Sequence, residues 1–125
     1  MILCLASFNP GYQKGFKELK PSTRQRFVSL SFGYPKESTE REIVIQESSV
    51  DNDTAKKLIS LGNKIRHLTE LGLTETVSTR LLVDAGKLIN SGLGKRLAVH
   101  TAVVEPLTDD EDTLAALYDL TDLMI

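Results

Sequence analysis

Asn9 stands where a polar side chain could act on a ligand. It follows the apolar run at residues 2–6 and precedes Pro10 and Gly11. In open α/β sheets ligands bind beyond the carboxyl ends of the strands, and a carboxamide there could orient a water and contact a phosphate. The same residues are also typical of a simple turn, so the sequence pattern leaves both interpretations open.

Two arginines also carry a positive charge at positions where it could act on a phosphate group. Arg26 precedes an alternating segment, and a guanidinium can stabilise the charge that phosphoryl transfer spreads over phosphate oxygens. Arg80 lies in the first turn of a predicted helix, where the helix N-terminus adds partial positive charge. The alternatives are solvated surface arginines, with Arg80 near Glu75 or Asp84.

The remaining reactive residue types are isolated. His67 and His100 stand alone and Cys4 is the single cysteine, so the spacing predicts no structural metal site. Cys4 lies in an apolar run and is expected to be an inert core thiol. The acidic residues 109–112 lack the spacing of a calcium loop and are expected to cap a helix.

Composition limits the function classes. The chain has 125 residues, of which 41% are hydrophobic and 26% charged, with a net charge of -2. This size suits one domain, and the charge argues against a nucleic-acid binder. No apolar stretch reaches the roughly 18 to 20 residues that span a bilayer, and no signal peptide is evident. We therefore expect no membrane span and a cytoplasmic location.

Two strands and then helices are the elements that must position these residues. Residues 2–6 form an apolar run and residues 27–32 alternate, so each predicts a strand, with a loop and one helical turn at residues 21–26 between them. From residue 36 onward, apolar residues recur at spacings of three and four. The predicted helices are one opened by a capping box at 39–42, one from Asp51 or Asp53 to Gly72, one from Ser78 to Gly92, one over 94–104 stopped by Pro106, and one opened by Thr108 and Glu111.

The expected fold class is mainly α with a small β part. Residues 1–35 are assigned to the two strands and residues 36–125 to a helical domain. Two strands with a long connection do not make a self-sufficient sheet. We therefore expect the first 35 residues to be non-native, to pair with each other or, preferably, to pair with a second copy of the chain.

Five segments in order carry a likeness to a known family. Together they resemble the CbbQ/NirQ/NorQ branch of the MoxR-type AAA+ ATPases over nearly the whole chain. The segments are residues 6–13 (ASFNPGYQ), 19–27 (LKPSTRQRF), 34–35 (YP), 78–83 (STRLLV) and 106–110 (PLTDD).

The resemblance implies that the chain is the C-terminal part of such an ATPase, with two strands left from the α/β nucleotide-binding core followed by the helical lid. It makes Asn9 the sensor-1 residue, Arg26 the arginine finger, with Arg24 as the other candidate, and Arg80 the sensor-2 residue. Asn9 and Arg80 would contact ATP, which the parent would use with Mg2+. The P-loop is not found in these 125 residues, because Gly94-Lys95 is followed by Arg96 where the P-loop needs Ser or Thr. The acidic Mg2+-binding strand is not found either, because the acidic residues at 119–122 precede apolar residues instead of ending an apolar strand.

The family also implies partners. The parent is expected to form a ring-shaped homo-oligomer and to work with a von Willebrand A-type adaptor on a target enzyme complex, as a chaperone-like activator of a metalloenzyme or a carbon-fixing enzyme. Without the P-loop and the acidic strand, this chain alone is expected neither to bind ATP and Mg2+ nor to hydrolyse ATP. The alternative is a free-standing helical protein-interaction module, derived from an AAA+ lid and without an ATPase role.

Overall fold

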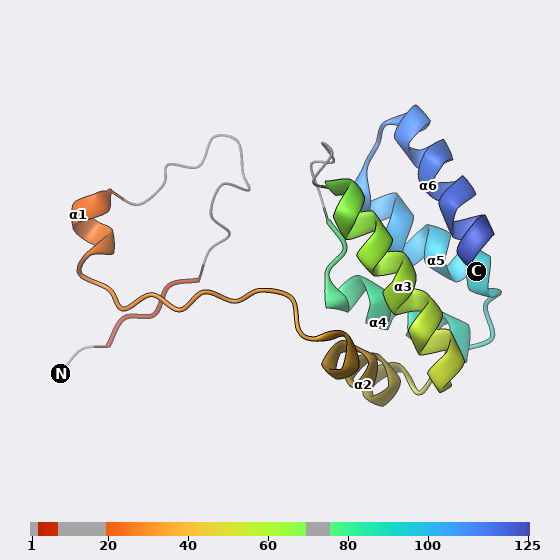
Figure 1. The fold of residues 1–125 in the computed structure, drawn as a ribbon, viewed down its shortest axis with the longest axis horizontal. Coiled ribbons are helices and arrows are strands. Elements are labelled where there is room, and N and C mark those ends of the chain that lie inside the picture. The colour runs from red at the N-terminus through yellow and green to blue at the C-terminus, as the bar shows by residue number, and fades with distance from the viewer. Residues whose placement is uncertain (1–2, 8–19, 70–75) are drawn as a thin grey trace. The chain divides into compact units, whose positions relative to one another are not determined.

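The computed structural model describes residues 3–7, 20–69 and 76–125, and these residues contain six α-helices and no strand (Figure 1). The chain divides into two compact units, Met1–Gly33 and Tyr34–Ile125. The mainly helical prediction is confirmed, whereas its β part is not seen in the described residues. None of the described helices has both the length and the apolar character that crossing a bilayer requires.

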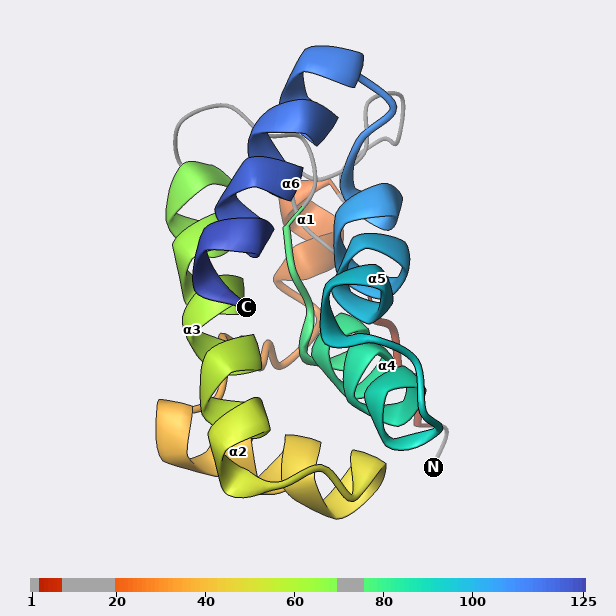
Figure 2. The ribbon, with the colours of Figure 1, turned by 90° about the vertical axis from the view of Figure 1, so that its right-hand side faces the viewer.

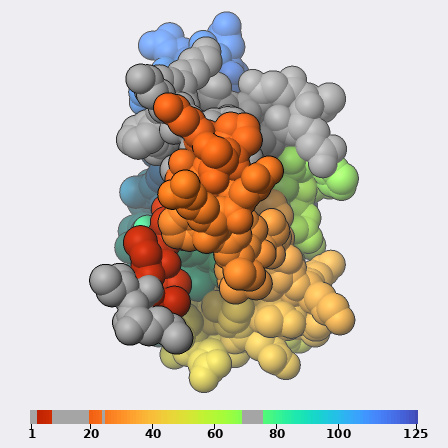
Figure 3. All heavy atoms as spheres, turned by 90° about the vertical axis from the view of Figure 1, so that its left-hand side faces the viewer, coloured from red at the N-terminus to blue at the C-terminus, as the bar shows by residue number. Residues whose placement is uncertain are grey.

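The first unit contains α1, Pro21–Arg24, with proline in its first turn as predicted. The strands predicted at residues 2–6 and 27–32 are wrong for the residues that the structure describes there, which form no strand. A strand needs a neighbouring strand that forms hydrogen bonds with its backbone N–H and C=O groups, and no such pairing forms among these described residues. In the segment at residues 25–33, which is orange in Figure 3, Val28, Leu30 and Phe32 are 78–95% exposed. Cys4 is also exposed, which corrects its assignment to a core.

The second unit is a bundle of helices around one core (Figure 2). Helix α2 packs against α3 and α4, and α6 packs against α3 and the π-helix. The core is built mainly from aliphatic side chains such as Leu58, Ile65, Leu82 and Val103. The elements are α2 Glu37–Ser48, α3 Asn52–Thr69, α4 Thr79–Asn90, α5 Lys95–Val99, a π-helix His100–Val104, a 3-10 helix Glu105–Leu107 and α6 Glu111–Met124.

Several helix boundaries follow the predicted signals. Asp51 directly precedes α3 and accepts hydrogen bonds from Thr54, which also hold the pKa of Asp51 below its ordinary value. Ser78 caps α4 by accepting from the backbone N–H of Leu81 at 3.4 Å. Gly92 takes a φ of 107° just after α4, which glycine adopts without strain. The predicted helix end at Gly72 lies outside the described residues.

Other boundaries differ from the prediction. Helix α2 begins at Glu37 after Lys36, which makes no side-chain cap, so the expected capping box at 39–42 lies within the helix. Helix α6 is capped by Asp110, whose carboxylate accepts from the Thr113 N–H at 3.0 Å. The predicted cap, Thr108, instead accepts from the Asp110 N–H. The helix predicted over 94–104 changes to a π-helix at His100, and Pro106 then lies in the 3-10 helix.

Helices α2 and α4 approach closely at Gly86. A Cβ atom added to Gly86 would contact the Ser48 hydroxyl and lie 2.7 Å from the Ser48 Cβ. Both residues are buried, and the Ser48 hydroxyl donates back to the Val44 carbonyl. Because Ser48 is short and held in place, the helices have no room for a larger residue here.

We predict that Gly86→Ala destabilises the helical unit by about 1–3 kcal/mol, despite the better helix propensity of alanine, because the added methyl forces α2 and α4 apart. Urea unfolding followed by circular dichroism measures this change. Gly33→Ala is the control, since an added Cβ there has no heavy atom within 4 Å. Equal stability of Gly86→Ala and the unmodified chain would contradict the close packing.

Candidate functional site

The three predicted site residues fall in separate parts of the structure. Asn9 lies outside the described residues. Arg26 is exposed in the first unit, where its backbone N–H donates to the Thr23 carbonyl at 3.1 Å after α1. The Arg24 side chain also lies outside the described part. Arg80 is exposed in the first turn of α4, in the second unit.

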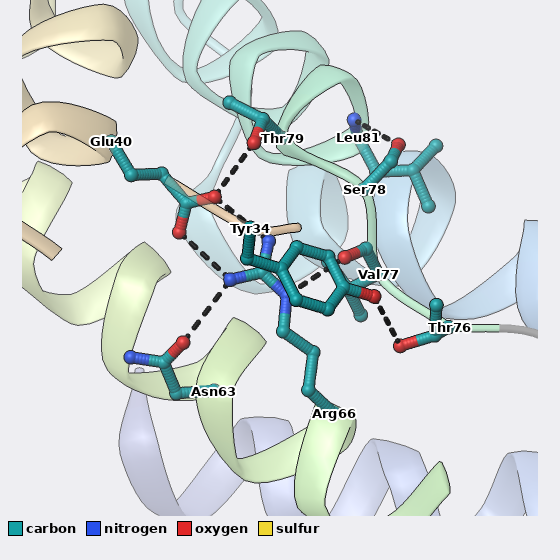
Figure 4. A network of polar contacts seen from close by, with 9 residues as sticks. All are labelled: Tyr34, Glu40, Asn63, Arg66, Thr76, Val77, Ser78, Thr79 and Leu81. Atoms are coloured by element: carbon teal, nitrogen blue, oxygen red, sulfur yellow. Dashed lines mark hydrogen bonds and ion pairs between the residues drawn. The ribbon is translucent and has the colours of Figure 1, made fainter. Parts of the chain in front are cut away.

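Next to Arg80 the structure contains a polar network that the sequence analysis did not find (Figure 4). Its centre is Glu40 on α2, whose side chain is only 1% exposed. Arg66 on α3 donates through both terminal nitrogens to the two oxygens of Glu40, at 2.9 and 2.8 Å. This fork-shaped pairing is the strongest geometry for an arginine and a carboxylate.

The Arg66 guanidinium also contacts residues other than Glu40. Its Nε donates to the Val77 carbonyl at 2.9 Å, and Nη1 also donates to Oδ1 of Asn63 at 3.1 Å. The guanidinium lies 4.0 Å from the centroid of the Tyr34 ring, which is a cation–π contact. The Tyr34 hydroxyl donates in turn to Oγ1 of Thr76 at 3.1 Å.

The network ends on the first residue of α4. The Thr79 hydroxyl donates to Oε2 of Glu40 at 2.7 Å. Thr79 directly precedes Arg80, and the Ser78 cap lies on its other side. Three stretches of chain therefore meet at one carboxylate: α2 itself, the end of α3 and the start of α4. The residues before α2 join the network through the contact of Tyr34 with Arg66.

Burial and pairing act on Glu40 in opposite directions. Burial raises the pKa of the Glu40 carboxyl. The hydrogen bonds from Arg66 and Thr79 and the charge of Arg66 lower this pKa, and together they outweigh the effect of burial. The net effect holds the pKa of Glu40 below its ordinary value of 4.5. Glu40 is therefore ionised at neutral pH and is suited to orienting its donors rather than to transferring protons.

The sequence offered a weak signal for this network. Glu40 was assigned to a capping box, where a glutamate is expected to be exposed. Arg66 directly follows Ile65, which belongs to the predicted apolar stripe of α3. A charge beside such a stripe can face the core, but spacing alone does not reveal its partner 26 residues away.

A second polar cluster joins the π-helix to α6. The His100 ring lies against the Tyr118 ring at a tilt of 38°, with centroids 4.3 Å apart, and its Nε2 lies 3.3 Å from Oδ1 of Asp122. The Tyr118 hydroxyl donates to Glu105. Among the described residues, no three histidine, cysteine or acidic side chains come together as metal ligands.

An open groove of about 770 Å³ lies along α3 and α6. Its walls are mostly apolar, with Leu68, Leu120 and Met124 among the lining residues, and Glu37, Lys64 and His67 add charged or polar groups. None of the predicted site residues lines it.

The fold and its polar network define the class of this protein as a helical domain with a buried ionic centre. Residues 40–124 match the family described as CbbQ/NirQ/NorQ C-terminal, so the chain belongs to that family. This confirms the resemblance expected from the sequence. The match begins at Glu40, the central residue of the network.

Three relatives give the same result. The chain is 46% identical to the denitrification regulatory protein NirQ of Pseudomonas aeruginosa, over 99% of this chain and 48% of the relative. It is 50% identical to the protein CbbQ of Hydrogenophilus thermoluteolus, over 89% and 42%. It is 48% identical to the protein NorQ of Paracoccus denitrificans, over 95% and 44%. The chain thus spans less than half the length of each of these relatives.

We predict that Arg66→Ala destabilises the helical unit by about 3–5 kcal/mol, because it leaves the buried Glu40 charge without its main partner. Denaturant unfolding measures the loss. Arg96→Ala is the control, since Arg96 is 64% exposed and 4.0 Å from Asp122, and such surface pairs contribute about 0–1 kcal/mol. Similar losses in the two variants would contradict a central role for the buried pair.

We also predict a pH dependence from Glu40. Because its pKa is lowered by folding, its contribution is fully present above 4.5 and is lost as the pH falls through the lower folded value. The stability advantage of the unmodified chain over Glu40→Gln should therefore shrink as the pH is lowered below 4.5. Denaturant unfolding at a series of pH values measures it. Glu42→Gln, at an exposed glutamate of α2, is the matched surface control. Curves for Glu40→Gln that stay parallel to those of the unmodified chain would refute the assignment.

Proposed function

We propose that this chain is the C-terminal portion of an ATP-dependent AAA+ remodelling ATPase that activates a target enzyme complex. The observation that carries the proposal is the first turn of α4, where Arg80 is exposed while the adjoining Thr79 is bound to the buried Glu40. An exposed guanidinium at a helix N-terminus suits a phosphate group. Family membership supports the assignment of that phosphate to ATP.

In this proposal Asn9 is the sensor-1 residue, which orients the attacking water, and Arg26 is the arginine finger. Arg80 contacts the phosphates from the helical unit. ATP with Mg2+ supplies the energy of the remodelling step. The family resemblance implies that the P-loop and the acidic strand of the parent would hold Mg2+.

The proposed partners are further copies of the same protein in a ring, a von Willebrand A-type adaptor and a target enzyme. The name of the relative NirQ describes a regulatory role in denitrification, and this supports activation of another enzyme as the task. The family resemblance implies a nitrogen-oxide-reducing or a carbon-fixing enzyme as the target.

A second candidate is a free-standing helical interaction module without an ATPase role. The compactness of Tyr34–Ile125, with its own core, favours it. The two candidates differ in what the genome encodes beside this sequence. A P-loop in the same or an adjacent reading frame supports the ATPase, whereas unrelated neighbours support the module.

We predict that Asn9→Ala, Arg26→Ala and Arg80→Ala each lower ATP turnover at least about tenfold in a protein that joins this chain to a P-loop segment, because each removes a transition-state contact. A steady-state ATPase assay measures this. Arg96→Ala is the exposed-arginine control, and this chain alone should show only background turnover because it lacks the groups that hold the triphosphate. Full turnover in all three variants would favour the interaction module.

Mixing variant subunits tests whether Arg26 acts on the site of a neighbouring subunit. If Arg26 acts across a subunit interface, mixing Arg26→Ala subunits with P-loop-inactive subunits restores some complete sites. Mixed rings that stay as inactive as either parent would place Arg26 within its own subunit.

A further inference from the structure

Thr79 directly precedes Arg80 in the sequence and binds to Glu40, the most deeply buried charged side chain among the described residues. Its hydroxyl donates to Oε2 of Glu40 at 2.7 Å, and the other bonds of that carboxylate come from Arg66 (Figure 4). Glu40 cannot shift toward or away from α4 without losing its paired bonds to Arg66. The Thr79 hydroxyl therefore binds to a fixed point.

The Ser78 cap alone holds this turn weakly. The distance from the Leu81 nitrogen to Oγ of Ser78 is 3.4 Å, beyond the usual range for such a bond. The Thr79 bond is shorter, and its acceptor is ionised, which makes it the stronger of the two. Since helix ends fray, the bond to Glu40 is the contact that best keeps the first turn of α4 closed.

The segment leading into α4 is also held from the other side. The Val77 carbonyl accepts from Arg66, and Thr76 accepts from the hydroxyl of Tyr34. Tyr34 is the first residue of the helical unit and stacks on the same guanidinium. The backbone on the N-terminal side of Arg80 is therefore fixed relative to α2, α3 and the start of this unit.

We propose that Thr79 is a positioning residue, which sets the direction of Arg80 by bonding the first turn of α4 to the Glu40–Arg66 pair. The proposal rests on the proposed ATPase function for the task of Arg80. A flexible exposed arginine reaches a small target reproducibly only if its Cα is fixed, because misplacement by about 1 Å can cost a hundredfold in rate.

The test compares two substitutions at Thr79. Thr79→Val keeps the shape and removes the hydroxyl, whereas Thr79→Ser keeps the hydroxyl and removes the methyl. In the 125-residue chain, hydrogen exchange of the Val83 and Asp84 amides reports opening of the first turn, because helical amides donate to the carbonyls four residues earlier. We expect at least about fivefold faster exchange in Thr79→Val and little change in Thr79→Ser.

Exchange at Leu117 in α6 is the control for general loosening of the fold. Faster exchange at Val83 and Asp84 with Leu117 unchanged supports the proposal. Equal rates in Thr79→Val and the unmodified chain, or an equal rise at Leu117, would overturn it. This part of the test does not depend on any ATPase activity.

A double-substitution cycle in the protein joined to a P-loop segment tests the link to Arg80. If Thr79 acts through Arg80, Thr79→Val lowers kcat about tenfold with Arg80 present and has no further effect in the Arg80→Ala background. Equal losses in both backgrounds would overturn the proposal, because a merely structural role is independent of Arg80. If Arg80→Ala leaves turnover unchanged, the proposed function of Arg80 fails, and the exchange data alone decide whether Thr79 holds the turn.

Discussion

The buried carboxylate of Glu40 is the constraint on which the helical unit depends. An ionised group that is 1% exposed is stable only when donors surround it, and here they come from α3 and from the start of α4. The folded core therefore requires Arg66 and Thr79 to lie at the same point. Tyr34 then covers the guanidinium, so the residues before α2 are fixed as well.

The same constraint explains how α2 and α4 pack. The buried row of α2 is Glu40, Val44 and Ser48, each four residues from the next. Glu40 contacts Thr79, and about two turns further along both helices Ser48 contacts Gly86, so the helices run side by side in the same direction. The hydrogen bond from Thr79 to the ionised Glu40 fixes one end of this pairing, and a glycine that allows close approach fixes the other.

This row also shows how far the sequence could predict the fold. Helices α3 and α4 were predicted because their buried positions are mostly apolar and the residues before them, Asp51 and Ser78, are short polar residues. Helix α2 buries a glutamate and a serine, which hydrophobic periodicity does not detect, so its start and the network were missed. Residues 27–32 have the alternation of a strand, but a strand depends on a partner that local sequence does not specify. For the candidate site, the resemblance alone selected Arg80, whereas its support by Thr79 required the three-dimensional contacts.

The two units differ in how completely they bury their apolar side chains and pair their charges, and this difference bears on the proposed function. The helical unit encloses its core and pairs its buried charge, whereas Val28, Leu30 and Phe32 of the first unit are exposed. In the proposed ATPase, Arg80 thus belongs to a unit that folds around its own contacts before nucleotide arrives. An arginine whose Cα is held in place beforehand loses less conformational freedom on binding than one on a mobile backbone. The buried Glu40–Arg66 pair would therefore contribute to catalysis through the order that it imposes on α4, although neither residue would touch the nucleotide.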